Sequence, residues 1–498
     1  MAAATKKNQS TQATKQEQVI GVAVNPDLHR AFETISMKRM PYDLLYDYYR
    51  GNHPLKYSTN RLRKAFDRIY VYFAQNWIAV IVDAVLDRLN LKGFDFKDET
   101  AADKFSKLWE QYHIHLMADD VHEAATVLGE AFVVVWRDED TDETDVYYND
   151  PRMCQMFYDP DRPTEKLFAA KMWIDGKTRH PKFILYYPDR LEHYISQVIV
   201  SQRDGWISSA GGFQLDPEYG KDGIEPNEYD IVPVFHFRSG RISGKKEIGQ
   251  SEISLQDAVN KLFADMMVSS EFYTFSQRVI ISQADPGDLK NQAGNNWWIP
   301  AGDGKGQASS VTELGNKTLD PYLNAIDKLA QAMAIISRTP KHYMLLTGGD
   351  PSGDALLAME APLNKKVKKR MEGYEVEWKA MAKFMLQLEG MDIDETDIVP
   401  IWEPVETSQP LASAQTIQTE VNSGIPLVTS LRRRGWDNDE IEQMQEDMQD
   451  EQEMHSGLAQ DALNRMRGSD ASDNYDPGNN TPDNANAEPG NVNGEQGG

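Results

Sequence analysis

Three long stretches of the chain repeat apolar residues every three or four positions, the period of a helix that buries one face. The first spans residues 61–91 and the second 251–276, where Ser251 is the expected N-cap. The third opens at Pro321, behind Asp320 as N-cap, and ends near Arg338. The second helix would be about 39 Å long at 1.5 Å per residue. Residues 278–318 hold a short strand and a Gly- and Asn-rich excursion between two helices, so we expect a protrusion there.

Residues 131–240 show a different pattern, one of short strand-like runs. AFVVVW at 131–136 is β-branched and apolar, as in a buried strand. Shorter strand-like runs follow, separated by Asp, Pro and Gly clusters. These runs are Asp145–Tyr148, Gln155–Tyr158, Ala169–Trp173, Phe183–Tyr187 and Val232–Phe237. The pattern predicts a largely antiparallel β module inside an α+β protein.

The remaining segments complete the expected order of elements. Residues 1–25 are polar without periodicity, which predicts a mobile arm, and 41–50 (PYDLLYDYYR) predict a short helix. Helices are further expected at 101–112, at 119–128, from Asp350 to about Glu389 with a kink at Pro362, and at 410–465. A strand is expected at 398–402, and the Asn-, Pro- and Gly-rich tail from 468 predicts disorder.

Charge narrows the classes of function. The 498 residues carry 78 Asp and Glu against 52 Lys and Arg, a net charge of -26. Tight binding of duplex DNA requires a basic surface, so the total charge argues against tight binding of DNA over the whole protein surface. It still permits DNA, a polyanion, to move past the protein.

The longest apolar run, Trp77–Leu86 with Asp83 inside it, is shorter than the roughly 18 residues of a membrane span. The lysines of the N-terminus precede no apolar stretch, and one cysteine, Cys154, suits a reducing compartment, so we expect a cytoplasmic site of synthesis and no membrane.

A search for catalytic chemistry finds no constellation. GDGKG at 302–306 lacks the spacing of a phosphate-binding loop, and the residues around Ser251 lack the second glycine of a nucleophile elbow. His113, His115 and His122, near Asp119 and Asp120, match no metal signature, and ordinary structural histidines are favoured over ligands. No cofactor or metal is therefore expected.

One basic cluster stands out against the acidic background. Lys365, Lys366, Lys368, Lys369 and Arg370 follow one another on the expected long helix. They spread over more than half of its circumference, which favours a solvated face. Binding of an anion or an acidic partner surface is the alternative. An opposite cluster lies at 437–453, with nine acidic residues and no Lys or Arg.

Four landmarks resemble one known family. They are YYRGNHPL within 43–55, NWIAVIVDAVLDRLNLKGF at 76–94, the segment 248–276 (IGQSEISLQDAVNKLFADMMVSSEFYTFS), and SRTPKHYMLLTGGDPSGDALLAMEAPLNKKVKKR at 337–370. Their order over about 330 residues resembles that in portal proteins of long-tailed bacteriophages, of the siphophage type. None of the four is a catalytic fingerprint.

The resemblance implies a ring-forming portal fold with a mixed α/β wing, a two-helix stem, a protruding clip and a helical crown. The implied segments are an N-terminal arm at 1–25, wing at 26–248, first stem helix at 249–276, clip at 277–319, second stem helix at 320–338, tunnel loop at 339–350, a long wing helix and return at 351–405, crown at 406–467 and a disordered tail at 468–498. The roles of 437–453 and of the tail are not carried over.

The same resemblance implies a homo-oligomeric ring, expected to be a dodecamer, at one capsid vertex of the virion. Double-stranded DNA would pass through it, and the terminase large subunit, a head-tail adaptor, the major capsid protein and scaffolding protein would be its partners. The second stem helix and tunnel loop would lie nearest the DNA. The candidates there are Lys328, Gln331, Arg338, Lys341, His342, Tyr343, Met344 and Leu345. Trp297, Trp298 and Ile299 would bind a partner at the clip or pair between subunits.

Two other classes of function stay open at this point. One is a capsid adaptor or scaffold without a DNA channel. The other is a metal-dependent enzyme acting on nucleic acid, supported only by plentiful carboxylates and the Lys365–Arg370 cluster.

Overall fold

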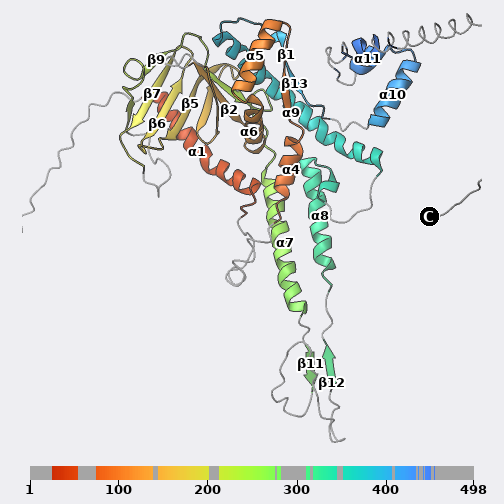
Figure 1. The fold of residues 1–498 in the computed structure, drawn as a ribbon. Coiled ribbons are helices and arrows are strands. Elements are labelled where there is room, and N and C mark those ends of the chain that lie inside the picture. Colours follow the sequence, from red (N-terminus) through yellow and green to blue (C-terminus); the bar gives the residue numbers. More distant parts are fainter. Residues whose placement is uncertain are drawn as a thin grey trace, which may run out of the picture. The chain divides into compact units, whose positions relative to one another are not determined.

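The computed structural model describes residues 25–53, 75–137, 144–200, 212–274, 278–281, 310–313, 318–344, 352–405, 410–432 and, between 436 and 454, residues 436, 441, 443–449 and 454. It divides the chain into two compact units, Met1–Thr407 and Ser408–Gly498. Both helices and antiparallel sheets build the first unit, which confirms the predicted α+β class (Figure 1). The arm predicted at 1–25 and the tail predicted from 468 lie outside the described residues, apart from Asn25.

Helix α1 (Pro26–Tyr49) is longer than the short helix predicted at 41–50. It begins where the side chain of Asn25 accepts a hydrogen bond from the Asp27 amide, with Pro26 in the first turn. The helix continues through Pro41, which the prediction took as its start. Buried side chains on both sides of this proline, including Ile35 and Tyr42, pack on the body and offset the missing backbone hydrogen bond.

One core joins segments from both ends of the first unit. It contains α4 (Trp77–Leu86), β1 (Leu91–Phe96), α5 (Glu99–Gln111), α6 (Ile114–Val127), α9 (Gly353–Leu388) and β13 (Ile398–Trp402). The prediction of one helix over 61–91 is wrong at two places among the described residues. The helix begins only at Trp77, behind the N-cap Asn76, and it stops at Leu86, after which 91–96 pair antiparallel with β13. Residues 54–74 lie outside the described residues. Helix α9 begins at Gly353 after the N-cap Ser352 and continues through Pro362 as one helix.

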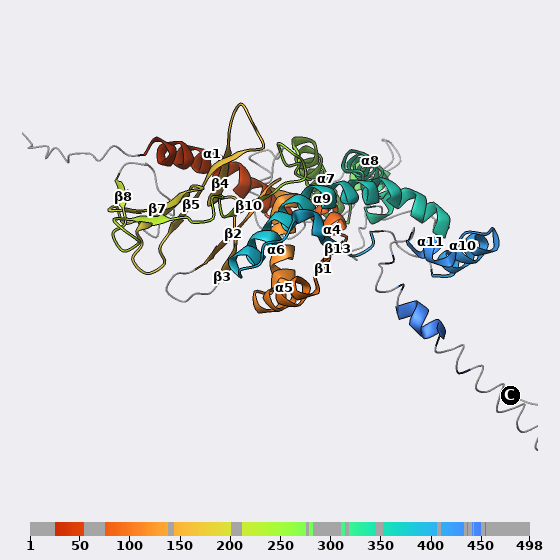
Figure 2. The ribbon, with the colours of Figure 1, turned by 90° about the horizontal axis from the view of Figure 1, so that it is seen from above.

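The predicted antiparallel β module is confirmed as two sheets. One sheet has the order β10-β2-β3, and the other runs β4-β5-β6-β7-β8 with β9 paired to β7. The bounds are β2 (Ala131–Arg137), β3 (Thr144–Asn149), β4 (Cys154–Tyr158), β5 (Lys166–Ile174), β6 (Pro181–Tyr186), β7 (Arg190–Ser196), β8 (Phe213–Leu215), β9 (Ile224–Pro226) and β10 (Val234–Phe237). The strands β7, β8 and β9 were not predicted. Helix α1 lies along the larger sheet, with Leu28 and Phe32 packed against Phe157 and Phe168 (Figure 2).

Two further helices, α7 (Gln250–Thr274) and α8 (Asp320–Ser337), run side by side (Figure 1). Between them in sequence lie β11 (Arg278–Ile281) and β12 (Ser310–Glu313), which pair antiparallel. Helix α7 starts one residue before the expected N-cap Ser251. Its start is closed instead by Glu252, whose Oε2 accepts the Gly249 amide at 3.0 Å.

The second unit contains α10 (Pro410–Asn422) and α11 (Leu427–Arg432), and residues 443–449 are also helical. Helix is thus present in the described part of the range predicted at 410–465, but it is interrupted, because Gly424 follows α10 in the left-handed conformation at φ +90°. The Ser430 hydroxyl donates to Glu420 Oε2 at 2.6 Å and joins the two short helices. No helix among the described ranges combines the length and apolar character that crossing a membrane requires.

His122 is a packing residue of the core. Its ring stacks on Tyr374 at 5.4 Å, and its Nε2 accepts the Trp378 indole N–H at 3.2 Å. The rings of His113 and His115 lie perpendicular to each other, with centroids 6.0 Å apart, outside this stack. Within the described residues, no three His, Cys, Asp or Glu side chains gather as metal ligands would.

Acid is expected to weaken the fold through His122. Burial lowers its pKa from 6.5 to about 3, so the unfolded chain binds the proton first as the pH falls below 6.5. The stability that the neutral ring contributes is fully present above pH 6.5 and is lost as the pH falls toward 3. The loss in the free energy of unfolding is about 2 kcal/mol at pH 5. Urea unfolding at pH 7 and pH 5 measures this loss. His122→Gln should shrink the difference, whereas the exposed His29→Gln should keep it; equal pH dependence in all three proteins would contradict the assignment.

Candidate functional site

The paired helices α7 and α8 share an apolar seam with α4. Ile326, Ala330 and Met333 of α8 are buried against Val259 of α7 and Trp77 of α4. The stripes predicted on both helices therefore face each other. Further from α4, the hydroxyls of Ser269 and Tyr322 lie 3.0 Å apart and link the two helices.

Gln256 fastens α7 to the N-terminus of α4. This fully buried side chain accepts the amides of Trp77 at 2.9 Å and Ile78 at 3.3 Å, and it donates to the Gln75 carbonyl at 2.6 Å. The first amides of a helix have no partner within it, so the glutamine amide satisfies two of them. The next residue, Asp257, accepts the Tyr48 hydroxyl of α1 at 2.7 Å. The start of α7 is thus bonded to two other helices.

A buried ionic group, Glu247, Lys366 and Arg370, joins both paired helices to α9. Glu247 lies three residues before α7, and its carboxylate accepts Lys366 Nζ at 2.9 Å and Arg370 Nε at 3.1 Å. Lys366 also donates at 2.8 Å to the carbonyl of Ser337, the last residue of α8. A cation at a helix C-terminus satisfies an orphan carbonyl and complements the helix dipole. We call these three residues the stem-root triad.

The triad corrects the prediction for the basic cluster. Lys365, Lys368 and Lys369 are exposed, as a solvated face requires, but Arg370 is only 5% exposed and Lys366 is mostly covered. Burial lowers the pKa of Lys366, while the Glu247 carboxylate acts in the opposite direction. The acidic partner of the cluster is therefore a residue of the same chain.

The segment after α8 is held by Arg88, which follows the C-terminal end of α4. Arg338 ends the helix in the left-handed conformation at φ +57°, and a short 3-10 helix, Lys341–Tyr343, follows. Arg88 donates to the Tyr343 hydroxyl at 2.9 Å and to Asn364 Oδ1 of α9 at 3.2 Å. These bonds connect the start of the expected tunnel loop with α9.

The structure separates the predicted channel residues into groups. Lys328, Arg338 and Lys341 are exposed, and Gln331 and His342 are half-buried. Lys328 Nζ lies 3.5 Å from Gln331 Oε1 on the same helix face. Met344 is 5% exposed and packs in the α7–α8 seam, so its observed place is a core position. Leu345 and the predicted clip residues Trp297, Trp298 and Ile299 lie outside the described residues.

Sequence reasoning missed Arg88, Glu247 and Gln256. Each is a polar residue that binds partners far away in the chain, and Lys366 and Glu247 are 119 positions apart. A polar residue inside the apolar stripe of 251–276 was the available signal for Gln256. No local pattern marked Arg88 or Glu247.

A family model matches most of the chain and defines its class: this is a phage portal protein. The model, described as phage portal protein, SPP1 Gp6-like, covers residues 29–457. The chain therefore belongs to the SPP1 Gp6-like portal family, as the four landmarks indicated. As a portal protein it is a component of the phage virion, and the role of portals in the passage of DNA follows from the family.

Other comparisons add little to this assignment. A chain of a solved structure described as the neck of an empty GTA particle computed with C6 symmetry aligns with a TM-score of 0.35 and 10% identity. The alignment covers 76% of this chain and 96% of that chain. No curated protein matches the sequence. The assignment rests on the family model.

Proposed function

We propose that copies of this chain close into a ring, with twelve as the expected number, at one vertex of the capsid. DNA is packaged and ejected through the opening of this ring. Membership of the portal family over residues 29–457 is the observation that carries the proposal. One chain cannot surround a duplex, and head-to-tail contacts between identical chains close such a ring when the rotation permits. Assembly takes place in the host cytoplasm.

The expected domain roles support this reading. The paired helices α7 and α8 serve as the stem, residues 277–319 as the clip, and 339–350 as the tunnel loop. The body that holds α1, α9 and the two sheets serves as the wing, and 406–467 as the crown. The stem-root triad and Gln256 give the stem a fixed anchor in the wing, which a channel under load requires.

The channel wall is proposed to include the exposed residues Lys328, Arg338 and Lys341, together with Gln331, His342, Tyr343 and Leu345. Few cations on an acidic ring let phosphates slide, because each neutralised phosphate adds to binding strength. Met344 keeps its packing role in this proposal. The protein acts as a conduit and has no catalytic activity.

The partners follow from the same role. The clip residues Trp297, Trp298 and Ile299 are proposed to bind the terminase large subunit during packaging and a head-tail adaptor afterwards. Aromatic residues of this kind contribute strongly to interfaces. The major capsid protein and scaffolding protein surround the ring at its vertex.

Electron microscopy tests the ring directly. Negatively stained full-length protein should show closed rings with an axial opening, and mass photometry should give a mass near twelve times 56.5 kDa. Rings without an opening would favour an adaptor or scaffold. Single chains under every assembly condition, with or without scaffolding protein, would contradict the proposal. Metal-dependent cleavage of DNA that one Asp substitution abolishes would contradict the absence of catalysis.

A further inference from the structure

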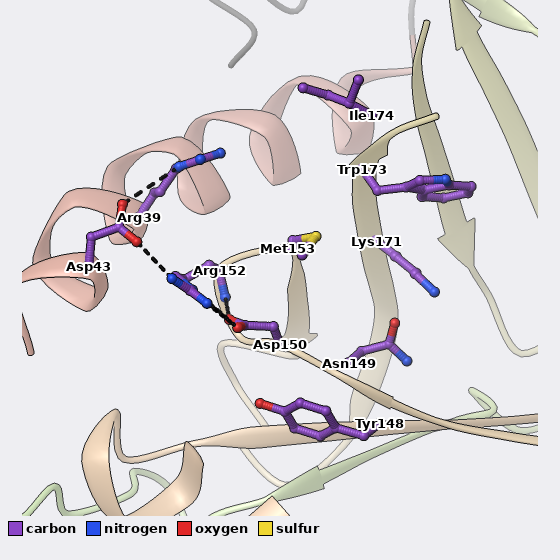
Figure 3. A pocket seen from close by; sticks show the side chains of 10 residues that line it. All are labelled: Arg39, Asp43, Tyr148, Asn149, Asp150, Arg152, Met153, Lys171, Trp173 and Ile174. Atoms are coloured by element: carbon purple, nitrogen blue, oxygen red, sulfur yellow. Dashed lines mark hydrogen bonds and ion pairs between the residues drawn. The ribbon is translucent and has the colours of Figure 1, made fainter. Parts of the chain in front are cut away.

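A cavity of about 740 Å³ opens between α1, the strands β3 and β5, and the turn that follows β3 (Figure 3). Arg39 and Asp43 line it from α1, and Lys171 and Trp173 line it from β5. Lys171 and Trp173 are two positions apart on one strand, so their side chains share a face of the sheet. The cavity combines cationic and apolar walls in a chain that is otherwise strongly acidic.

The carboxylates of the cavity are already engaged. The Arg152 guanidinium donates to Asp150 Oδ2 at 2.6 Å and to Asp43 Oδ1 at 3.0 Å (Figure 3). Asp43 also lies 3.7 Å from Arg39 Nε. The carboxylates of Asp43 and Asp150 are therefore both paired with arginine side chains.

Among the described residues, no carboxylate forms an ion pair with Lys171. Its Nζ lies 5.3 Å from the centroid of the Trp173 ring, and it also neighbours the thiol of Cys154, which burial keeps neutral. The side chain is partly buried, and burial lowers its pKa. A cation removed from water and not paired is a costly arrangement, which a carboxylate placed in the cavity would relieve.

An exposed apolar stripe runs along the same helix beside the cavity. Met37, Met40 and Leu44 are 77%, 80% and 42% exposed and lie at helical spacing. Met40 is one turn from Asp43 at the cavity rim. A partner that covers this face needs apolar side chains next to carboxylates.

The chain contains a helix with an apolar side chain next to carboxylates. Residues 443–449 are helical and expose Glu446, Asp447 and Met448. They belong to the segment 437–453, which has nine acidic residues and no Lys or Arg. Closed rings use heterologous contacts, in which two different patches of each chain complement one another. The cationic cavity and the acidic helix form such a pair of patches.

We propose that the cavity of one subunit binds the acidic helix 443–449 of a second copy. A carboxylate of Glu446 or Asp447 pairs with Lys171, and Met448 covers the apolar stripe of α1. This inference rests on the proposed ring and identifies a contact that would join its neighbours. Burial of the Lys171 charge against a carboxylate then occurs only in the assembled protein.

Disulfide trapping between differently labelled chains tests the contact. Full-length Met153→Cys, at the cavity wall, is mixed with full-length Met448→Cys, assembled and oxidised. The native Cys154 is fully buried with a pKa raised to about 12, so it supplies little thiolate to compete. A cross-linked heterodimer on a non-reducing gel is expected from the mixture and not from either variant alone.

Two controls make the result specific. Val198→Cys, which is 58% exposed and does not line the cavity, should give at most a trace of product with Met448→Cys. Lys171→Glu in the cavity chain should reduce trapping roughly tenfold, and Glu446→Lys with Asp447→Lys in the helix chain should restore it. Trapping unchanged by the charge swap would overturn the role of Lys171.

Mass photometry of the same samples separates the two hypotheses. Rings whose Met153–Met448 trapping is no stronger than the Val198 control would overturn the docking inference and leave the portal ring intact. Single chains without trapping would overturn both. Trapping in rings, lost and restored by the charge swap, supports both.

Discussion

Replacing Glu247 with alanine is expected to lower the free energy of unfolding by about 3–5 kcal/mol, because removal of one partner leaves buried charges unpaired. Lys366 and Arg370 would both lose their carboxylate. Denaturant unfolding measures the loss. Hydrogen exchange should accelerate at the end of α8, since Lys366 also holds the Ser337 carbonyl.

An exposed ion pair supplies the matched control. Glu165 lies 2.8 Å from Arg162 with both side chains largely in water, and Glu165→Ala should cost about 0–1 kcal/mol. Combining Glu247→Ala with Lys366→Met should recover part of the loss, because one of the stranded cations is then absent. If Glu247→Ala proved as mild as Glu165→Ala, the triad would not anchor α7 and α8 to α9.

The sequence predicted those parts of the fold that repeat locally. The strand-like runs Asp145–Tyr148 and Ala169–Trp173 were visible because clusters of Asp, Pro and Gly separate them from their neighbours. Helices α7 and α8 were visible because apolar residues repeat along them with a period of 3.6 residues. Pairing of β1 with β13 was not visible, because Phe96 and Ile398 are far apart in the sequence and no local pattern links them. The same tertiary packing carries α1 through Pro41 against local propensity.

The candidate site divides in the same way. The exposed positions Lys328 and Lys341 could be selected from the family landmarks and from helix spacing. The contacts that hold these helices in place could not be predicted, because Arg88, Gln256 and Glu247 each form hydrogen bonds with residues more than 100 positions away. The basic cluster shows the limit most clearly: helical spacing alone assigns Lys366 to solvent, whereas the folded chain places a carboxylate and a helix end beside it.

The chain reaches α7 through a close crossing of two backbone segments. Gly129 turns the chain from α6 into β2 at φ +93°, and Gly244 lies against it shortly before α7. A Cβ on Gly244 would lie 1.5 Å from the Gly129 carbonyl oxygen, a separation that no packed structure tolerates. Nearby, the Glu247 amide donates to the Thr126 carbonyl at 2.9 Å. The crossing therefore helps to place the triad carboxylate.

Gly244→Ala is accordingly expected to destabilise the protein by about 3 kcal/mol, because rigid backbone must move apart to admit one methyl group. Gly129→Ala should cost less, about 1–2 kcal/mol, since its added Cβ meets atoms no nearer than 3.5 Å and the penalty is the left-handed backbone. Gly176→Ala, with nothing within 4 Å of its Cβ, should change stability by less than about 0.5 kcal/mol. Denaturant unfolding of the three variants should reproduce this order. If Gly244→Ala does not yield folded protein, the order of the other two still tests the backbone account, and a Gly244→Ala protein as stable as Gly176→Ala would refute the crossing.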